Sequence, residues 1–133
     1  MALVTQVSPS MDTNTGMFAP QLSGDFTAGE DLLAVAPCYL KTSDGLVYMS
    51  NGTAADEAAE FVGFTPKSYK AGQSVTLFGI GARFKYAAFS GQVGNKLFIA
   101  ATAGRLDTAA TTGDAVGVAQ VINATDIRVI RNV

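Results

Sequence analysis

Residues 40–48 read LKTSDGLVY, and residues 98–106 read FIAATAGRL. Each stretch passes from apolar residues through a polar turn with one glycine into a second short apolar run, which is the pattern of a strand, a turn and a strand. Glycine suits such a turn because it adopts a positive φ without steric cost. The two stretches therefore predict two hairpins of the same kind in one chain.

The residues after each hairpin also follow the same order. An alanine-rich stretch leads to 62–64, VGF, and then to the strand-like run 73–78, QSVTLF. In the second half, a shorter polar stretch leads to 116–118, VGV, and then to 126–130, DIRVI. The second half is thus predicted to be a shortened copy of the first. Two units are too few for a solenoid, which needs about three repeats, so we expect the copies to pack together in one domain.

Other segments show the alternation of β-strands. In residues 83–86, RFKY, the basic side chains fall on one face and the aromatic ones on the other. Strand starts recur at intervals of roughly 8–12 residues, which is typical of a sandwich or a barrel. We therefore predict an all-β protein: a compact small barrel or sandwich of short strands with internal pseudo-duplication, an extended N-terminal arm and at most one short helix.

The one candidate helix is residues 53–60, TAADEAAE, with Thr53 as a possible N-cap and acidic residues in the first turn. The corresponding stretch of the second copy, residues 108–113, is shorter. This loop is where the two halves differ most. Loops that vary on a fixed scaffold tend to carry specific contacts, and simple drift is the alternative.

Residues 1–22 differ from the rest of the chain because they are polar, turn-prone and without a regular period. Met17, Phe18 and Leu22 are spaced apolar residues, and Pro20 keeps the segment extended. We interpret residues 1–22 as an arm that orders on a partner, with these four residues as its contacts, and residues 23–133 as a single β-rich domain. A frayed terminus, or an edge strand folded back on the domain, remains the alternative.

Composition limits the classes of function. The 133 residues are 48% hydrophobic and 15% charged, against a usual charged share of about 25%. This low charge fits either a surface that is partly covered by a partner or an ordinary neutral β-domain. The formal net charge is −2, and the nine basic residues are scattered. We therefore expect no nucleic-acid partner, since binding its phosphates needs clustered Lys and Arg.

The residues of common catalytic sites are absent from the sequence. There is no histidine and one cysteine, so a histidine base, a histidine triad and a thiolate zinc cluster are excluded. No phosphate-binding glycine motif is present. The aspartates at 44, 107, 114 and 126 are isolated, and side-chain bonding to turn backbone explains them. We expect a protein that is not an enzyme, with no catalytic, cofactor or metal site.

Cys38 lies between apolar residues, which favours a small buried side chain over a nucleophile and fits synthesis in a reducing cytosol. The first residues lack the pattern of a secretory signal. No apolar run approaches the ~18 residues that span a bilayer. We expect a soluble protein with no membrane partner.

Several of these stretches resemble the head decoration (cement) proteins of tailed bacteriophages. The resemblance covers about residues 22–133 and is carried by 28–32 (AGEDL), 43–48 (SDGLVY), 62–64 (VGF), 71–77 (AGQSVTL), 113–119 (GDAVGVA) and 127–129 (IRV). It implies a small β-rich protein, made in the host cytoplasm, that binds the outside of an assembled capsid in the virion. The implied partners are the major capsid protein and further copies of this chain, as a homotrimer. An extended N-terminal arm commonly takes part in such binding.

Two other functions remain open. A surface-displayed module that captures glycans or host surfaces would present an exposed aromatic side chain, and Tyr69 is the aromatic residue predicted to lie on a loop. A head–tail joining or tail component would instead assemble in rings. The number of copies per virion separates this last class from a decoration protein.

Overall fold

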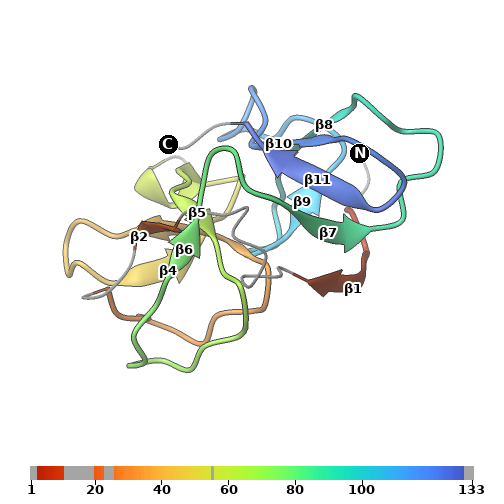
Figure 1. The fold of residues 1–133 in the computed structure, drawn as a ribbon. Coiled ribbons are helices and arrows are strands. Elements are labelled where there is room, and N and C mark those ends of the chain that lie inside the picture. Colours follow the sequence, from red (N-terminus) through yellow and green to blue (C-terminus); the bar gives the residue numbers. More distant parts are fainter. Residues whose placement is uncertain (1–2, 11–19, 23–25, 55, 131–133) are drawn as a thin grey trace.

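The computed structural model describes residues 3–10, 20–22, 26–54 and 56–130, and over these ranges its regular structure is β-strand apart from one 3-10 turn (Figure 1). The predicted all-β class is therefore confirmed. The strands are β1 (Gln6–Ser10), β2 (Pro20–Leu22), β3 (Pro37–Leu40), β4 (Val47–Met49), β5 (Gly63–Phe64), β6 (Leu77–Phe78), β7 (Arg83–Ala87), β8 (Lys96–Ile99), β9 (Leu106–Asp107), β10 (Ala119–Val121) and β11 (Asp126–Val129).

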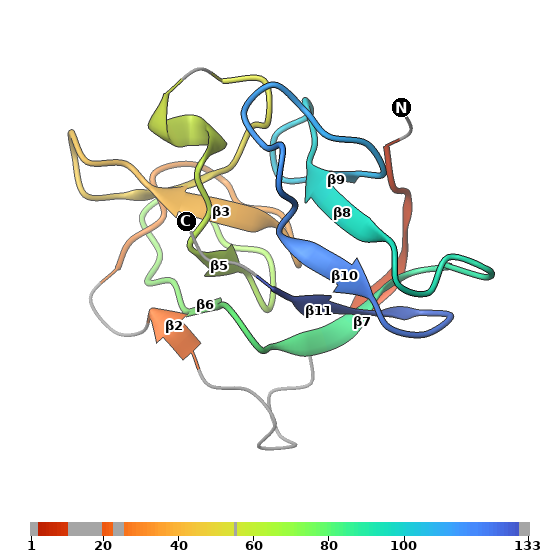
Figure 2. The ribbon, with the colours of Figure 1, turned by 90° about the horizontal axis from the view of Figure 1, so that it is seen from above.

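The strands form two sheets that lie side by side (Figures 1 and 2). One has the order β2-β6-β5-β3-β4, and the other has the order β1-β7-β11-β10-β8-β9. Strands β2, β6, β5, β3 and β4 of the first sheet correspond in order to β7, β11, β10, β8 and β9 of the second. All neighbouring strands in both sheets are antiparallel. The chain thus contains the same five-stranded unit twice. We call β2–β6 copy 1 and β7–β11 copy 2.

The hairpins fix which residues correspond. Leu40 pairs with Val47 in copy 1, and Ile99 pairs with Leu106 in copy 2. The stretches between the paired residues, 40–47 and 99–106, are both eight residues long. The sixth residue of each is a glycine with a positive φ, Gly45 at 73° and Gly104 at 79°. The predicted correspondence of the two hairpins agrees with this register.

The predicted match between 62–64 and 116–118 is displaced by two residues. The N–H of Val62 donates to the carbonyl of Cys38, and that of Val118 donates to the carbonyl of the corresponding residue, Leu97. Val62 therefore corresponds to Val118, not to Val116. The two glycines have different roles: Gly63 lies within β5, where a Cβ would approach the Phe78 carbonyl oxygen to 2.9 Å, whereas Gly117 has a φ of 95° in the turn before β10.

Each copy has its own core. In copy 1 the buried cluster is built around Cys38, Val47 and Leu77. In copy 2 the corresponding residues, Leu97, Leu106 and Ile127, belong to a second and larger cluster. Corresponding inward positions are thus apolar in both copies, since each sheet curls around its own inner face.

Phenylalanine side chains of copy 1 join the two units. Phe61, Phe64 and Phe78 belong to the core cluster of copy 2. The ring centroids of Phe64 and Phe84, on β7, are 5.0 Å apart, and those of Phe61 and Phe64 are 5.1 Å apart. Aromatic pairs at such distances stabilise beyond the area they bury. The two copies consequently pack against each other through these rings.

The predicted helix is reduced to a single 3-10 turn, Glu57–Ala59, within the part of 53–60 that the structure describes. Its N-cap is Asp56, whose carboxylate accepts the N–H of Ala58 at 3.0 Å. The predicted cap, Thr53, is wrong: its N–H and its hydroxyl both donate to Asn51 Oδ1 in a local turn. Asx turns of this kind compete with helix formation.

Candidate binding surface at the N-terminal strand

The described parts of residues 1–22 pair with the two sheets. Gln6 pairs with Ala87 and Ser10 with Lys85, so β1 extends the sheet of copy 2. Just before β1, the N–H of Val4 donates to the carbonyl of Leu106 on β9 at 2.8 Å. The segment therefore bridges the two ends of this sheet and closes it into a barrel. Residues 3–10 therefore match the alternative interpretation of the sequence, an edge strand folded back on the domain.

The four predicted contact residues fall in two places. Met17 and Phe18 lie outside the described residues. Pro20 and Leu22 begin and end β2, and their backbone pairs with β6 at Phe78 and Leu77. The structure thus places Pro20 and Leu22 at the edge of the copy 1 sheet.

Residues 3–7 have one buried and one exposed side. Val4 is buried in the core of copy 2 and Gln6 is half-buried, whereas Leu3, Thr5 and Val7 are exposed. The exposed fraction is 42% for Leu3 and 47% for Val7. Apolar side chains on the solvent side of a terminal strand are sites where another protein surface can pack.

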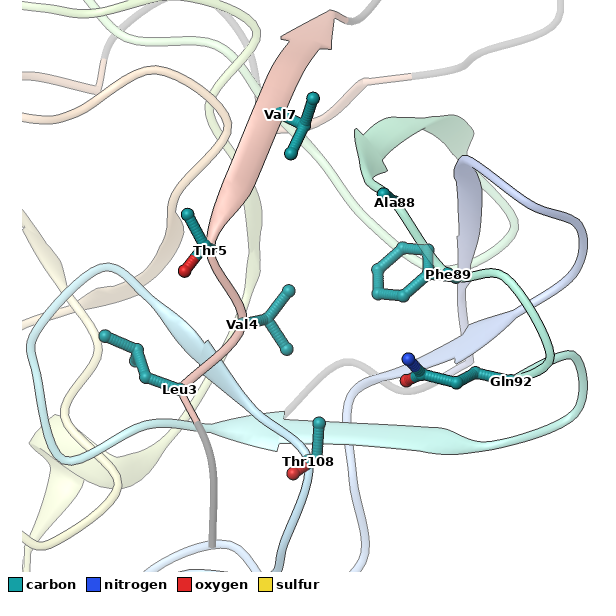
Figure 3. Close-up of a pocket in the computed structure, with 8 residues that line it drawn as sticks. All are labelled: Leu3, Val4, Thr5, Val7, Ala88, Phe89, Gln92 and Thr108. Atoms are coloured by element: carbon teal, nitrogen blue, oxygen red, sulfur yellow. The ribbon is translucent and has the colours of Figure 1, made fainter.

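These exposed side chains border an open depression of about 350 Å³. Figure 3 shows Val4 and Phe89 facing each other across it, with Gln92 and Thr108 along one side. The wall is therefore mainly apolar, and it is made by residues 3–7, the connection between β7 and β8, and Thr108 just after β9. Such a surface can accept an apolar side chain of a partner with few polar contacts.

Sequence reasoning missed this surface. It placed the contacts at residues 17–22, whereas the exposed apolar side chains of the described part of the arm are Leu3 and Val7. The usable signal was the alternation in residues 3–7, in which every second residue belongs to the same face of a strand. The apolar residues on both faces obscured that alternation.

An exposed aromatic platform is not found among the described tyrosines. Tyr69 was predicted to lie exposed on a loop, but it is 7% exposed and packs in the core of copy 1, which corrects that prediction. Tyr39 and Tyr86 are also buried. Tyr48 is half-buried, with Lys41 Nζ over its ring at 5.1 Å from the centroid.

The hairpin turn of copy 1 carries a polar cluster. The hydroxyl of Tyr48 donates to Asp44 Oδ2 at 2.6 Å, and Asp44 Oδ1 accepts the N–H of Leu46. The hydrogen bond to the carboxylate is the main reason that the pKa of Tyr48 is raised to about 12. The same bond is the main reason that the pKa of Asp44 is lowered. The cluster stiffens the turn.

The other isolated aspartates also bond within the chain. Asp114, which is buried, accepts the N–H groups of Ile99 and Gly117. Asp107 accepts the N–H of Ala109, and Asp126 pairs with Arg83 at 3.2 Å. The predicted side-chain bonding to backbone is right for Asp44, Asp107 and Asp114, whereas the carboxylate of Asp126 accepts from the side chains of Arg83 and Thr125. Asp107 and Asp126 also lie in strands, not in turns.

Cys38 is fully buried as predicted, and burial raises the pKa of its thiol. Among the described residues, no group of His, Cys, Asp or Glu side chains is arranged to hold a metal ion. No helix in the described ranges is long and apolar enough to cross a membrane. The surface beside the N-terminal strand is therefore the candidate site that the geometry offers.

No protein-family model matches this chain, and the search of curated proteins finds no match.

Proposed function

We propose that this chain is a non-enzymatic structural protein of a phage virion, which binds the outer surface of an assembled capsid and stabilises it. The observation that supports this function is the apolar surface of Leu3 and Val7 beside the depression at the N-terminal strand. A protein that binds only the assembled shell stabilises it by mass action and needs no reactive group.

In this proposal the N-terminal strand is the part that meets the capsid or a neighbouring subunit. Within the described residues, β1 is the terminal strand of its sheet order. The depression beside it could receive an apolar side chain of a partner. A homotrimer would place three such surfaces on the shell, and their avidity would exceed the affinity of one.

A glycan-binding or host-binding module is less well supported, because Tyr69 is buried. No observation in the described structure favours a head–tail or tail component. The resemblance of the sequence to capsid decoration proteins therefore remains the leading guide.

The test is co-sedimentation of the full chain with expanded capsids that lack it, with bound copies counted against the major capsid protein. Saturation near one copy per capsid subunit is expected. A few copies per particle, or none, would contradict a decoration role and favour a tail or receptor-binding role.

A matched pair of variants tests the surface itself. Val7→Asp places a charge beside the depression, whereas Val116→Asp places one at another exposed valine, which is 58% exposed. We expect Val7→Asp to weaken capsid binding about 10-fold or more, because a charge in an apolar contact is costly, and Val116→Asp to bind normally. Equal binding by both variants would exclude this surface. A deletion is less informative, since removing Val4 opens the core.

A further inference from the structure

The outer face of the copy 2 sheet gathers basic side chains that lie far apart in the sequence. Arg83 on β7 pairs with Arg128 on β11, which pairs with Gln120 on β10. Gln120 pairs in turn with Lys96 on β8. Directly opposed residues of antiparallel strands point to the same face, so these residues form one row across four strands. The two arginines and Lys96 are exposed, and Gln120 is half-buried.

This row carries more positive charge than its neighbours neutralise. Lys85 pairs with Asp126 next to the row, and Asp126 Oδ2 lies 3.2 Å from Arg83 Nε. Arg128 donates from Nη2 to the neutral amide oxygen of Gln120 at 3.0 Å. Like charges on directly opposed residues are unfavourable, so a negatively charged partner would stabilise the face. We call it the basic face, and its residues are Arg83, Lys85, Lys96 and Arg128.

The two copies carry opposite net charge. Residues 26–78 contain six acidic and three basic side chains, whereas residues 79–130 contain five basic and three acidic ones. Two of those three acidic residues, Asp107 and Asp114, are buried. The surface of copy 2 is therefore basic and that of copy 1 is acidic. A chain with its charge separated in this way is complementary to a second copy of itself that is arranged head to tail.

The carboxylates of copy 1 gather at the hairpin between β3 and β4 and at the 3-10 turn. Glu57 accepts the N–H of Thr42 at 2.8 Å, which holds the turn against the hairpin. Residues 41–60 carry one lysine and four acidic residues, which are Asp44, Asp56, Glu57 and Glu60. We call residues 41–60 the acidic segment. Its hairpin lies at the end of the molecule away from β7 and β11 (Figures 1 and 2), so it does not meet the basic face of its own chain.

We propose that the basic face of copy 2 binds the acidic segment of copy 1 in a second copy of this chain. The basic face has four positive charges and one carboxylate, and the acidic segment has the reverse. The two surfaces differ, so the contact is heterologous and forms a ring where the rotation closes. It uses none of the residues that line the depression beside the N-terminal strand. Its test needs only the protein itself, so a failure would leave the capsid experiment unaffected.

Sedimentation velocity of the full chain at high protein concentration tests the contact. At about 0.01 M salt the Debye length is about 30 Å, and the unmodified chain is expected to self-associate. At about 1 M salt the Debye length is about 3 Å, and the chain is expected to be monomeric, because exposed ion pairs are weak and are screened. A monomer at both salt concentrations would overturn the proposal, and so would association that salt does not weaken.

Reversed charges identify the two surfaces. One variant combines Lys96→Glu with Arg128→Glu on the basic face, and a second combines Glu57→Lys with Glu60→Lys in the acidic segment. Each variant alone should be monomeric at low salt, because its two surfaces then carry charge of the same sign. A mixture of the two should associate again, since each variant finds surfaces of opposite charge on the other. No recovery in the mixture would contradict the pairing.

A matched control separates the basic face from net charge. Lys67→Glu with Lys70→Glu changes the net charge by the same amount as the variant of the basic face, at two exposed lysines of copy 1. The control should associate like the unmodified chain. A control that is monomeric at low salt would show that net charge alone governs association. All six substituted side chains are exposed or half-buried, so the variants are expected to fold.

Nucleic acid is the other macromolecule that a basic face can bind. Duplex DNA is therefore titrated into the unmodified chain at the same low salt concentration. If the chain stays monomeric and instead binds the duplex, and Lys96→Glu with Arg128→Glu removes that binding, the partner is not a second copy and the proposal is wrong.

Discussion

Copy 1 and copy 2 have the same strand order but bury different faces. Phe64 and Phe78, on the outer face of the copy 1 sheet, pack into the core of copy 2. The corresponding residues of copy 2 are Gln120 and Arg128, which hydrogen-bond to each other at the surface. The contact between the copies is therefore head-to-tail, and the polar outer face of copy 2 ends the stacking. In repeat proteins the terminal unit needs a polar outer face, because no further unit covers it.

The copies also differ in how their sheets close. In copy 1 the closing segment comes from the long connection between β2 and β3: the N–H of Gly29 donates to the carbonyl of Val47, and the N–H of Val47 donates to the carbonyl of Thr27. In copy 2 the connection between β7 and β8 covers only 88–95, and residues 3–4 meet β9 instead. The N-terminal segment therefore supplies what the shortened copy lacks.

The largest expected effect concerns the junction between the copies. Phe64→Ala should lower the free energy of unfolding by about 3–5 kcal/mol, because it removes a fully buried ring. Gln120→Ala, at the corresponding position of copy 2, should change it by less than about 0.5 kcal/mol. Urea unfolding of both variants measures the difference. Similar losses in the two would show that the copies do not pack through one face only.

A smaller effect is expected at the two hairpin glycines. Both have a positive φ, so an alanine at either costs about 1–2 kcal/mol. A Cβ at Gly45 has open space, but one at Gly104 would lie 2.5 Å from Met49 Sδ in the other copy. Gly104→Ala should therefore cost about 1–3 kcal/mol more than Gly45→Ala, as overpacking does. Thermal unfolding tests this, and equal losses would mean that Met49 moves aside freely.

The smallest effect is the pH response of the copy 1 turn, which copy 2 lacks because Ala103 stands where copy 1 has Asp44. The pKa of Tyr48 is raised from 10.0 to about 12. The stability that this bond contributes is therefore complete below pH 10 and is lost as pH rises towards 12. The lowered pKa of Asp44 has its effect at low pH. The stability that the carboxylate contributes is complete above its ordinary pKa of 3.8 and is lost as the pH falls below that value.

Replacing the carboxylate tests this response. In Asp44→Asn the pKa of Tyr48 should fall back towards 10.0, which can be followed by NMR of the labelled tyrosine ring carbon. Tyr48→Phe identifies the resonance. If the substitution leaves the pKa of Tyr48 unchanged, the carboxylate is not its cause.

The sequence predicted the hairpins correctly because glycine at a turn and flanking apolar residues act locally. The sequence aligned Val62 with Val116 because VGF at 62–64 and VGV at 116–118 are similar. The correct alignment, Val62 with Val118, follows only from their backbone hydrogen bonds to Cys38 and Leu97. The sequence predicted an exposed Tyr69 because the nearby proline and lysines are typical of a surface loop. The loop exists, but the ring turns into the core.

The candidate surface was less predictable than the fold. Residues 1–22 were predicted to be a separate arm, whereas β1 and β2 pair with the two sheets, and the exposed side chains of Leu3 and Val7 were not singled out. Their exposure depends on which side of β1 faces copy 2, and that is decided by pairing with Lys85 and Ala87, far along the chain.

The sequence by itself determined the class of the fold and its duplication, since alternation, turn glycines and strand order are written in short stretches of residues. Only the tertiary structure decided that the copies pack head-to-tail and that the N-terminal segment closes copy 2. The physical reason is that these features join residues remote in sequence, and local patterns carry no information on which distant partner each strand edge or side chain will find.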